Sequence, residues 1–334
     1  MKHILLIATG GTIASKYTAT GLAPQIPGYE LPFYIPEAKN FCKINVIQPF
    51  NLDSTNISGK HWILLAELIH KNYQNYDGFV ICHGTDTMAY SAAALSYLVR
   101  NSKKPIVITG AQRPIDIPDT DARTNLLDSV RFASDERAHD VCIVFGGSVI
   151  AGTRAKKERT KSYNAFSSIN FPPIAVIQDK RIIFYIDDGK QNSGETVFSD
   201  RLGEKVFLYR LIPGSDGTML DLLIDRYDAL IIESFGVGGI PDYGDGRLKK
   251  SIQKWIIAGK VVIMATQVPN EGSDMSVYEV GHTVKSLYDI PESYDMTLEA
   301  VVAKTMWILG KTKDREEFCR LFYTSINHDI LFIT

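Results

Sequence analysis

The sequence lacks an excess of charge of either sign and lacks long apolar runs. Its 334 residues include 36 Lys and Arg against 38 Asp and Glu, which gives a net charge of -2. A chain with this balance offers no electrostatic basis for binding nucleic acid or an anionic membrane. None of its apolar runs approaches the roughly 20 residues that span a bilayer. We therefore expect no nucleic-acid partner and no membrane partner.

Cysteine is also scarce, and the four cysteines form no CxxC pair. Cys82 and Cys142 lie inside apolar runs, where reduced core cysteines are typical. The N-terminus, MKHILLIATGG, has only five apolar residues, 4–8, before two glycines interrupt it. This segment is too short for the apolar part of a signal peptide. It predicts a first buried strand, and the cytoplasm is the expected compartment.

The usual cofactor motifs are missing as well. The segment ATGGTIAS lacks the third glycine of a dinucleotide fingerprint, and the sequence has no GxxxxGK[ST] loop and no GxSxG elbow. The seven histidines are scattered without the spacing of metal ligands. These absences argue against a dinucleotide, a nucleoside triphosphate and a metal, so we expect no cofactor.

Short apolar, β-branched runs alternate with amphipathic segments along the chain, a pattern typical of a parallel α/β sheet. The polar stretch 188–204 interrupts this alternation and is the expected linker. We therefore predict a large N-terminal, mostly parallel α/β domain with flanking helices (1–187) and a smaller C-terminal α/β domain (205–334). The predicted strands are 4–8, 79–82, 106–109, 141–145, 206–211, 229–234 and 261–266. The predicted helices are 60–73, 88–100, 122–138, 219–226, 247–258, 298–309 and 315–325.

Glycine and small hydroxyl residues follow several of these strands. The segments are TGGTIAS (9–15), HGTDTM (83–88) and TGAQRP (109–114). Ligands of open α/β sheets bind at the carboxyl ends of strands, so these segments mark the expected site. A single threonine there is explained as a helix cap, but a cap does not need two threonines and an aspartate.

Hydroxyl chemistry is the interpretation that remains. A threonine is a weak nucleophile unless a neighbouring base takes its proton, and a desolvated lysine can serve as that base. The basic segment TRAKKERTK (153–161) offers Lys156 and Lys157 beyond a predicted strand end, although the sequence alone strongly favours a solvated surface loop for this segment. We expect His83 to be a loop residue with a satisfied hydrogen bond and not a catalyst.

Together, these segments resemble the bacterial-type L-asparaginases, in particular the cytoplasmic type I enzymes. The C-terminal segment DMTLEAVVAKTMWILG (295–310) adds to the resemblance. It implies an amidohydrolase that converts L-asparagine and water to L-aspartate and ammonia without a cofactor. Thr12 matches the primary nucleophile of that family. Thr85, Asp86 and a lysine match its second triad, and the spacing from Gly152 selects Lys157.

The resemblance also implies the residues that bind substrate. Ser54 and Thr55 match the site for the substrate carboxylate, and Asp86 would hold the α-ammonium group. Ala111 would present a backbone carbonyl to the leaving amide nitrogen. The other implied substrate-binding residues are Gly11, Asp53 and Gly84. Backbone N–H groups of the glycine-flanked segments at Thr12 and Thr85 would stabilise an oxyanion.

The sequence departs from the family's pattern near Thr12. Many relatives place an assisting tyrosine on the loop after the first threonine, where this chain reads TGLAPQ with Leu22. Tyr17, Tyr29 and Tyr278 are candidate replacements. Segment 15–34 contains five glycine or proline breaks, and we expect it to be a lid over the site.

The family commonly completes its site with residues of a second subunit. We therefore expect a homodimer or homotetramer. Gly239 stands where some relatives supply an asparagine to the neighbouring subunit. The acid that crosses the interface in relatives matches Glu271, Asp274 or Glu279 here.

Three other functions fit parts of the pattern. A glutaminase-asparaginase of broader specificity shares the motifs, because one methylene gives modest discrimination. The amidase component of a tRNA-dependent amidotransferase also shares them, but it carries an extra N-terminal domain, and here Thr12 falls within the first dozen residues. A non-catalytic amino-acid sensor would keep Ser54 and Asp86 without needing a nucleophile.

Overall fold

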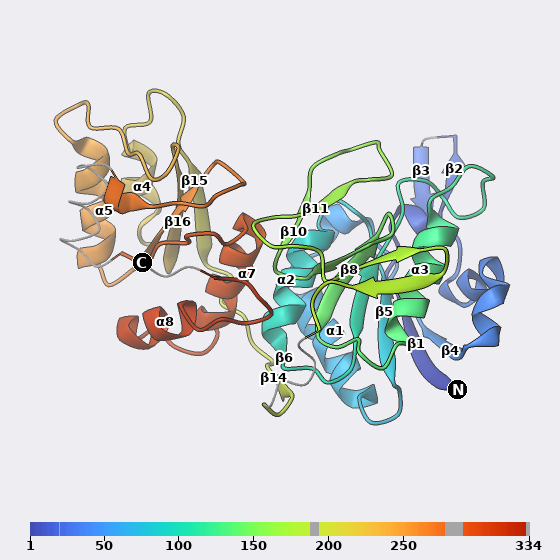
Figure 1. The fold of residues 1–334 in the computed structure, drawn as a ribbon. Helices are drawn as coiled ribbons and strands as arrows, with labels where there is room; N and C mark the ends of the chain where they lie inside the picture. Colours follow the sequence, from blue (N-terminus) through green and yellow to red (C-terminus); the bar gives the residue numbers. More distant parts are fainter. Residues whose placement is uncertain (20, 188–193, 278–289, 332–334) are drawn as a thin grey trace. The chain divides into compact units, whose positions relative to one another are not determined.

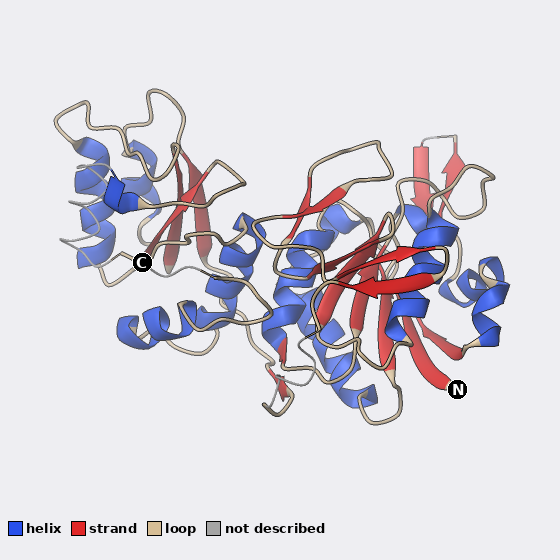
Figure 2. Cartoon of the chain, in the orientation of Figure 1, coloured by secondary structure: helices blue, strands red, loops and turns tan. Residues whose placement is uncertain are grey.

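The structure, a computed structural model, describes residues 1–19, 21–187, 194–277 and 290–331. It divides into two compact units, Met1–Asp200 and Arg201–Thr334 (Figure 1). The predicted fold class is confirmed: the chain is α/β, with a large central sheet in the first unit and a smaller sheet in the second (Figure 2).

The large sheet has eight strands in the order β13-β12-β9-β8-β7-β5-β1-β4. Five of them are parallel to one another, and their runs of valine and isoleucine suit strands covered on both faces. These five are β1 (Lys2–Ala8), β4 (Cys42–Ile47), β5 (Gly78–Cys82), β7 (Ile106–Thr109) and β8 (Val141–Phe145). Three antiparallel strands complete one edge: β9 (Ser148–Ala151), β12 (Ala175–Gln178) and β13 (Arg181–Phe184).

Helices cover both faces of this sheet. Alternate residues of β1, Ile4 and Leu6, pack with Leu126 and Val130 of α3 (Ala122–Ala133) in one apolar core. Figure 1 shows α1 (Gly59–Asn72) and α2 (Met88–Leu98) on the other side of the sheet. Helix α2 is buried along almost its whole length, which explains its alanine-rich sequence.

Several elements differ from the prediction. Helix α2 ends two residues early, because Val99–Arg100 forms strand β6, and α3 ends at Ala133 instead of residue 138. Strands β4, β9, β12 and β13 were not predicted; they are short or only partly buried, so their sequences mix polar and apolar residues. The same holds for the short pair β10 (Ala155–Lys157) and β11 (Phe166–Ser168).

Segment 15–34, expected to be an irregular lid, has regular structure. It contains the antiparallel hairpin of β2 (Ser15–Thr18) and β3 (Gly21–Pro24), followed by the 3-10 helix η2 (Gly28–Tyr34). A second 3-10 helix, η3 (Pro36–Asn40), leads into β4. The lid itself stays a prediction, now of a hairpin and not of an irregular loop.

The expected linker, 188–204, is partly ordered against the first unit. Within it, β14 (Val197–Phe198) pairs with β6, and the ring of Phe198 stacks on His70 of α1 at 4.1 Å between centroids. Residues 188–193 lie outside the described residues. The limits predicted for the two domains stay a prediction.

The second unit is built around a three-stranded parallel sheet in the order β15-β16-β17. These strands are Val206–Arg210, Ala229–Ser234 and Val261–Thr266. The helices are α4 (Thr218–Leu223), α5 (Arg247–Ile257), α7 (Leu298–Leu309) and α8 (Arg315–Phe322), with a 3-10 turn η5 at Met275–Val277. Helix α7 has its predicted bounds, whereas α4 and α8 each end three residues early. No helix of the described residues is both long and apolar enough to cross a membrane.

The topology of the first unit locates its site. Counted in chain order, the parallel strands lie as 2-1-3-4-5, so the connections diverge between β1 and β5. Doubly wound sheets bind ligands at such a switch point, beside the carboxyl ends of the strands. The residues after β1 and β5 are those singled out from the sequence, Thr12 and Thr85.

Candidate active site

Three loops meet at the switch point through backbone contacts that only glycine permits. A Cβ on Gly11 would lie 2.4 Å from the Cα of Gly84, and a Cβ on Gly84 would lie 2.6 Å from Oγ of Ser54. Gly11 also has φ +78°, a conformation that side-chain-bearing residues rarely adopt. The loops after β1, β4 and β5 are thereby packed against one another, and their polar side chains open into one space.

Two of the threonines in the motifs serve this architecture and not the pocket. The Thr9 hydroxyl donates to the carbonyl of Cys82 at 2.8 Å, and the Thr109 hydroxyl donates to the carbonyl of Val144 at 2.8 Å. Both bonds link one strand end to the next. A third threonine, Thr87, donates to the carbonyl of Ser54 at 2.8 Å and so ties the β5 loop to the β4 loop.

Thr12 and Thr85, in contrast, line one common pocket. Neither is a helix cap: the 3-10 helix η1 (Thr12–Ala14) begins after Gly11 without a side-chain cap, and α2 begins after Thr87 in the same way. Among the described residues, the Thr12 hydroxyl makes no hydrogen bond, so it is free to meet a ligand. The lining residues are Gly11, Thr12, Ser15, Leu22, Pro24, Asp53, Ser54, Gly84, Thr85 and Asp86.

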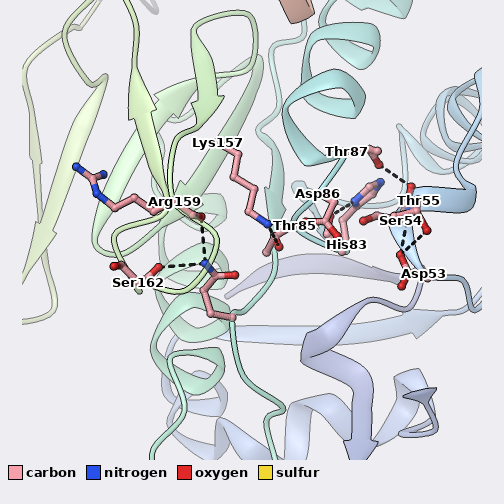
Figure 3. A network of polar contacts seen from close by, with 12 residues as sticks. Asp53, Ser54, Thr55, His83, Thr85, Asp86, Thr87, Lys157, Arg159 and Ser162 are labelled. Carbon is pink, nitrogen blue, oxygen red and sulfur yellow. Dashed lines mark hydrogen bonds and ion pairs between the residues drawn. The ribbon is translucent and has the colours of Figure 1, made fainter. Parts of the chain in front are cut away.

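Lys157 supplies the charge at Thr85. It extends from β10, and its Nζ donates to Oγ1 of Thr85 at 2.8 Å and to Oδ1 of Asp86 at 2.6 Å (Figure 3). The Lys157 side chain is 15% exposed, whereas that of Asp86 is 59% exposed. The ammonium group is therefore enclosed, and the carboxylate faces the open side of the pocket. The geometry brings Lys157 and not Lys156 to Thr85; Lys156 pairs with Ser167 in the β10–β11 register.

His83 lies beneath the pocket in a chain of hydrogen bonds that fixes its protonation. Its Nδ1 lies 2.7 Å from the carbonyl of Gly84, which only accepts, so Nδ1 carries the proton. Its Nε2 then accepts from the hydroxyl of Ser91 at 2.9 Å, and that oxygen accepts from Nε1 of Trp62 at 2.8 Å. Burial lowers the pKa of the His83 imidazole to about 4. A neutral His83 thus holds the Gly84 peptide, and it is not placed to transfer protons in the pocket.

The predicted substrate-binding residues are only partly brought together. Asp53 and Ser54 line the pocket, and Ser54 is buried. Thr55 does not line it; its N–H and its hydroxyl both donate to Oδ1 of Asp53 at 2.9 Å, capping the 3-10 helix η4 (Ser54–Asn56). Ala111 is fully buried and also lies outside the lining.

Only some backbone N–H groups of the glycine-flanked segments are available to a ligand. The N–H of Gly11 already donates to the carbonyl of Leu52 at 3.0 Å. The N–H groups of Thr12 and Thr85 make no hydrogen bond among the described residues. These two groups are therefore available to an oxyanion.

The loop around Ala111 is anchored by α3. The Asp121 carboxylate accepts the N–H groups of Gln112 and Arg113 at 2.9 to 3.1 Å. Asn125, one turn later, donates to the carbonyl of Gly110 at 3.0 Å and accepts the N–H of Gly146 at 3.0 Å. Two loops at the carboxyl edge of the sheet thus depend on one helix.

Neither Tyr17 nor Tyr29 lines the pocket. Leu22 and Pro24 of β3 do, and Tyr17 pairs with Leu22 across the hairpin while remaining 68% exposed. Directly opposed residues share one face of a hairpin, so Tyr17 lies on the pocket side of the β2–β3 hairpin. Tyr29 is also exposed. Tyr278 lies outside the described residues.

The candidate interface acids belong to the second unit. Asp274 accepts the N–H and the hydroxyl of Ser276, and Glu271 sits in a turn with φ +72°. Glu279 lies outside the described residues. In the parts of the chain that the structure describes, no three His, Cys, Asp or Glu side chains are grouped to hold a metal ion.

Comparison with known proteins agrees with this arrangement. A family model described as "Asparaginase, N-terminal" matches residues 3–188, and one described as "Glutaminase/Asparaginase C-terminal domain" matches residues 205–322. The chain belongs to the asparaginase family. It is therefore an amidohydrolase, as the resemblance of its motifs implied.

Relatives of two kinds lie within the asparaginase family. An L-asparaginase from Thermococcus kodakarensis is 34% identical, with 98% of each chain covered. A component of the glutamyl-tRNA(Gln) amidotransferase from Pyrococcus abyssi is also 34% identical; 99% of this chain is covered, but only 77% of the relative. The solved structure of the thermostable L-asparaginase from Thermococcus kodakarensis superposes with a TM-score of 0.92 at 33% identity, covering 99% of this chain and 100% of that one. That of L-asparaginase I from Vibrio cholerae gives 0.87 at 28% identity, covering 99% of each.

Several supporting residues of this asparaginase-family site were not found from the sequence. Trp62, Ser91, Asp121 and Asn125 hold the loops that carry the polar groups. All four lie within or at the start of helices whose patterns predict only helical structure, so the sequence offered no signal of their contacts. Leu22 was noted only as a departure, yet it lines the pocket.

Proposed function

We propose that the protein is an L-asparagine amidohydrolase that releases ammonia through a threonine nucleophile, Thr12. One observation carries the proposal: the side chains of Thr12 and Thr85 open into one pocket, and Thr85 is hydrogen-bonded to the enclosed amino group of Lys157. Two hydroxyls beside a lysine and a carboxylate suit nucleophilic attack on an amide, and they are more than a binding module needs.

The pocket suits the two charges of a free amino acid. Asp86, the more exposed partner of the ion pair, faces the solvent side and would bind the α-ammonium group. Ser54, held by the backbone contact with Gly84, would bind the α-carboxylate together with nearby N–H groups. Asp53 turns its Oδ1 to Thr55, so we assign it to shaping the loop.

The ion pair between Lys157 and Asp86 suggests how the lysine becomes a base. With Asp86 as its only ionic partner among the described residues, the Lys157 ammonium group donates to Thr85. A substrate ammonium group at Asp86 would place a second cation beside Lys157. The two cations would repel each other, and Lys157 would give up its proton to solvent. The neutral amine would then take the proton of the Thr12 hydroxyl by way of Thr85 and return it to the departing amine.

The chemical step follows from the free groups of the pocket. The Thr12 hydroxyl would attack the side-chain amide carbon, and its proton would pass to the departing amine. The N–H groups of Thr12 and Thr85 would stabilise the oxyanion. Water would then hydrolyse the acyl-threonine and release L-aspartate. Leu22 and Pro24 would exclude bulk water when the β2–β3 hairpin closes.

The test measures ammonia release with L-asparagine and with L-glutamine by the wild type, Thr12→Ala and Thr85→Ala. We expect both variants to fold and to lose about 10³-fold or more in kcat. Thr55→Ala is the matched control, because the Thr55 hydroxyl lies outside the pocket and Asp53 can still accept the N–H of residue 55; it should retain the wild-type kcat. Near-normal rates for Thr12→Ala would remove Thr12 from the role of nucleophile.

Two other functions are outcomes of the same assay. Comparable rates with both substrates would indicate a glutaminase-asparaginase of broader specificity. Substrate binding without ammonia release would indicate an amino-acid sensor. The amidotransferase component from Pyrococcus abyssi is 34% identical over 99% of this chain, so glutamine hydrolysis alone would favour that function instead.

We also propose that the active protein is a cytoplasmic homodimer or homotetramer whose second subunit completes the site. Among the described residues, no tyrosine lines the pocket of Thr12, and its only acids are Asp53 and Asp86. A second subunit could supply the further groups that family members use. Light scattering after size exclusion gives the mass in solution. A fully active monomer at assay concentration would contradict a shared site.

A further inference from the structure

The first unit has a second hollow, of about 460 Å³, which shares no lining residue with the catalytic pocket. One wall is formed by α3, another by the end of η2 and the start of η3, and the third by the turn between β12 and β13. Its volume falls within the range typical of small-molecule sites. The lining residues are Tyr34, Ile35, Glu37, Arg123, Thr124, Leu127, Asp128, Arg131, Ile177, Asp179 and Lys180.

Charges of both signs line this hollow, yet they do not pair with one another. Arg131 lies three residues after Asp128 on α3, a spacing that suits an ion pair. The two form none; the guanidinium group of Arg131 lies instead over the ring of Phe41, 4.9 Å from its centroid. Among the described residues, the Asp128 carboxylate has no hydrogen-bond or ion-pair partner. The hollow thus separates a carboxylate from a guanidinium group.

Burial without a partner is energetically unfavourable for both Arg131 and Asp128. The Nε of Arg131 is shielded from solvent and has no acceptor among the described residues. Burial raises the pKa of the Asp128 carboxyl to about 6, although the charge of Arg131 acts in the opposite direction. Unsatisfied buried polar groups are rare in native proteins, and violations of this kind gather at functional sites. The Nε of Arg131 is such a group, and the half-buried Asp128 carboxylate one turn earlier also lacks a partner among the described residues, which together indicate a missing ligand.

The spacing of the charges defines the chemistry of that ligand. A guanidinium edge with a free Nε–H recognises a carboxylate, and a half-buried carboxylate recognises an ammonium group. The same lining includes the partly buried side chains of Leu127 and Tyr34 and the buried side chains of Ile35 and Ile177, which provide apolar surface. A single anion would satisfy Arg131 and leave Asp128 repelled, so a small zwitterion fits better.

We propose that this hollow binds a free α-amino acid with an apolar side chain, its carboxylate at Arg131 and its ammonium group at Asp128. Lys180, on the β12–β13 turn, adds a cation at the rim, and Glu37 adds an anion. The apolar wall distinguishes this ligand from the amide substrate proposed for the catalytic pocket, whose lining is mostly polar. The proposal does not depend on the catalytic function.

The test is calorimetric titration of the full-length protein with L-leucine. Wild type should bind, whereas N-acetyl-L-leucine, which lacks the cation, and L-leucinamide, which lacks the anion, should bind about tenfold or more weakly. Asp128→Asn and Arg131→Gln should each weaken L-leucine binding by a similar factor. Glu67→Gln, an exposed change on α1, is the matched control and should bind as wild type does.

Further variants separate the two pockets. Asp86→Asn, which alters the catalytic pocket, should leave L-leucine binding intact. A circular-dichroism spectrum and a melting temperature like those of wild type would show that Asp128→Asn is folded. The proposal is overturned if wild type gives no binding heat, if Asp128→Asn and Arg131→Gln both bind L-leucine normally, or if Asp86→Asn abolishes binding. Binding of inorganic phosphate in place of L-leucine would likewise overturn it.

Discussion

We predict that His83 makes the free energy of unfolding fall at acid pH. The burial of its imidazole determines the size of that fall. The imidazole is fully buried and neutral, held between the Gly84 carbonyl and the Ser91 hydroxyl. Its pKa is about 4 in the folded state against an ordinary 6.5. Each pH unit of difference is worth roughly 1.4 kcal/mol, so the full effect is about 3 kcal/mol.

The sign follows from where the proton binds. Between pH 6.5 and about 4 the unfolded chain takes up a proton at His83 that the folded chain does not. The contribution of His83 to the free energy of unfolding is therefore complete above pH 6.5 and decreases as the pH drops through this window. Below about pH 4, His83 causes no further decrease. Protonation would also break the acceptor bond from Ser91 and loosen the Gly84 peptide beneath the pocket.

The assay compares urea unfolding of wild type and His83→Asn between pH 7.5 and 4. The asparagine does not titrate, and its amide can still donate to the Gly84 carbonyl. It should be less stable than wild type at pH 7.5, because Ser91 loses its acceptor, but it should lose about 3 kcal/mol less on acidification. His3→Asn, at an exposed position, is the control and should follow the wild-type pH dependence. Parallel curves for wild type and His83→Asn would refute the reasoning.

Three further predictions concern single contacts. Lys157→Met should lower kcat by about 10²- to 10⁴-fold with little change in melting temperature, as measured by ammonia release and calorimetry; full activity would exclude Lys157 as the base. Gly84→Ala should displace Ser54, which a Cβ would approach at 2.6 Å, and should cut kcat/KM about 10²-fold; an unchanged value would mean that the loops can relax. In the second unit, Lys304 and Asp329 form a 2.6 Å ion pair with both side chains 0% exposed. Lys304→Met alone should cost about 3–5 kcal/mol in chemical denaturation, and a Lys304→Met, Asp329→Leu double variant should recover most of it, because the uncompensated charge is gone.

The sequence was sufficient to predict four of the five parallel strands of the large sheet and the residues at their ends. Runs such as 79–82 and 141–145 are apolar because both faces of those strands are covered, so the pattern is direct. The half-exposed edge strand β4 alternates less clearly, and CKINVI does not stand out from a loop. Antiparallel additions such as β12 and β13 are set by tertiary pairing, which local pattern does not reveal.

Site residues were predictable where the chemistry requires a particular residue type. They were less predictable where the local backbone decides which way a side chain points. Thr12, Thr85 and Asp86, which line one pocket, were singled out because two hydroxyls and a carboxylate exceed the needs of capping. Thr55 was expected beside Ser54 at the substrate, but it turns away to Asp53, a choice made by the 3-10 turn that follows. Lys157 was separable from Lys156 by resemblance alone, since alternate residues of β10 point to opposite sides and the sequence does not show which side faces Thr85.

Helix α3 links the second hollow to two loops at the carboxyl edge of the large sheet. Near its start, Asp121 and Asn125 hold the loops at Gly110–Arg113 and Gly146; two turns on, Asp128 and Arg131 face the other hollow. A helix resists bending over so short a length. A ligand at Asp128 that moved these loops enough to change substrate affinity would, by thermodynamic reciprocity, have its own affinity changed by substrate by the same factor.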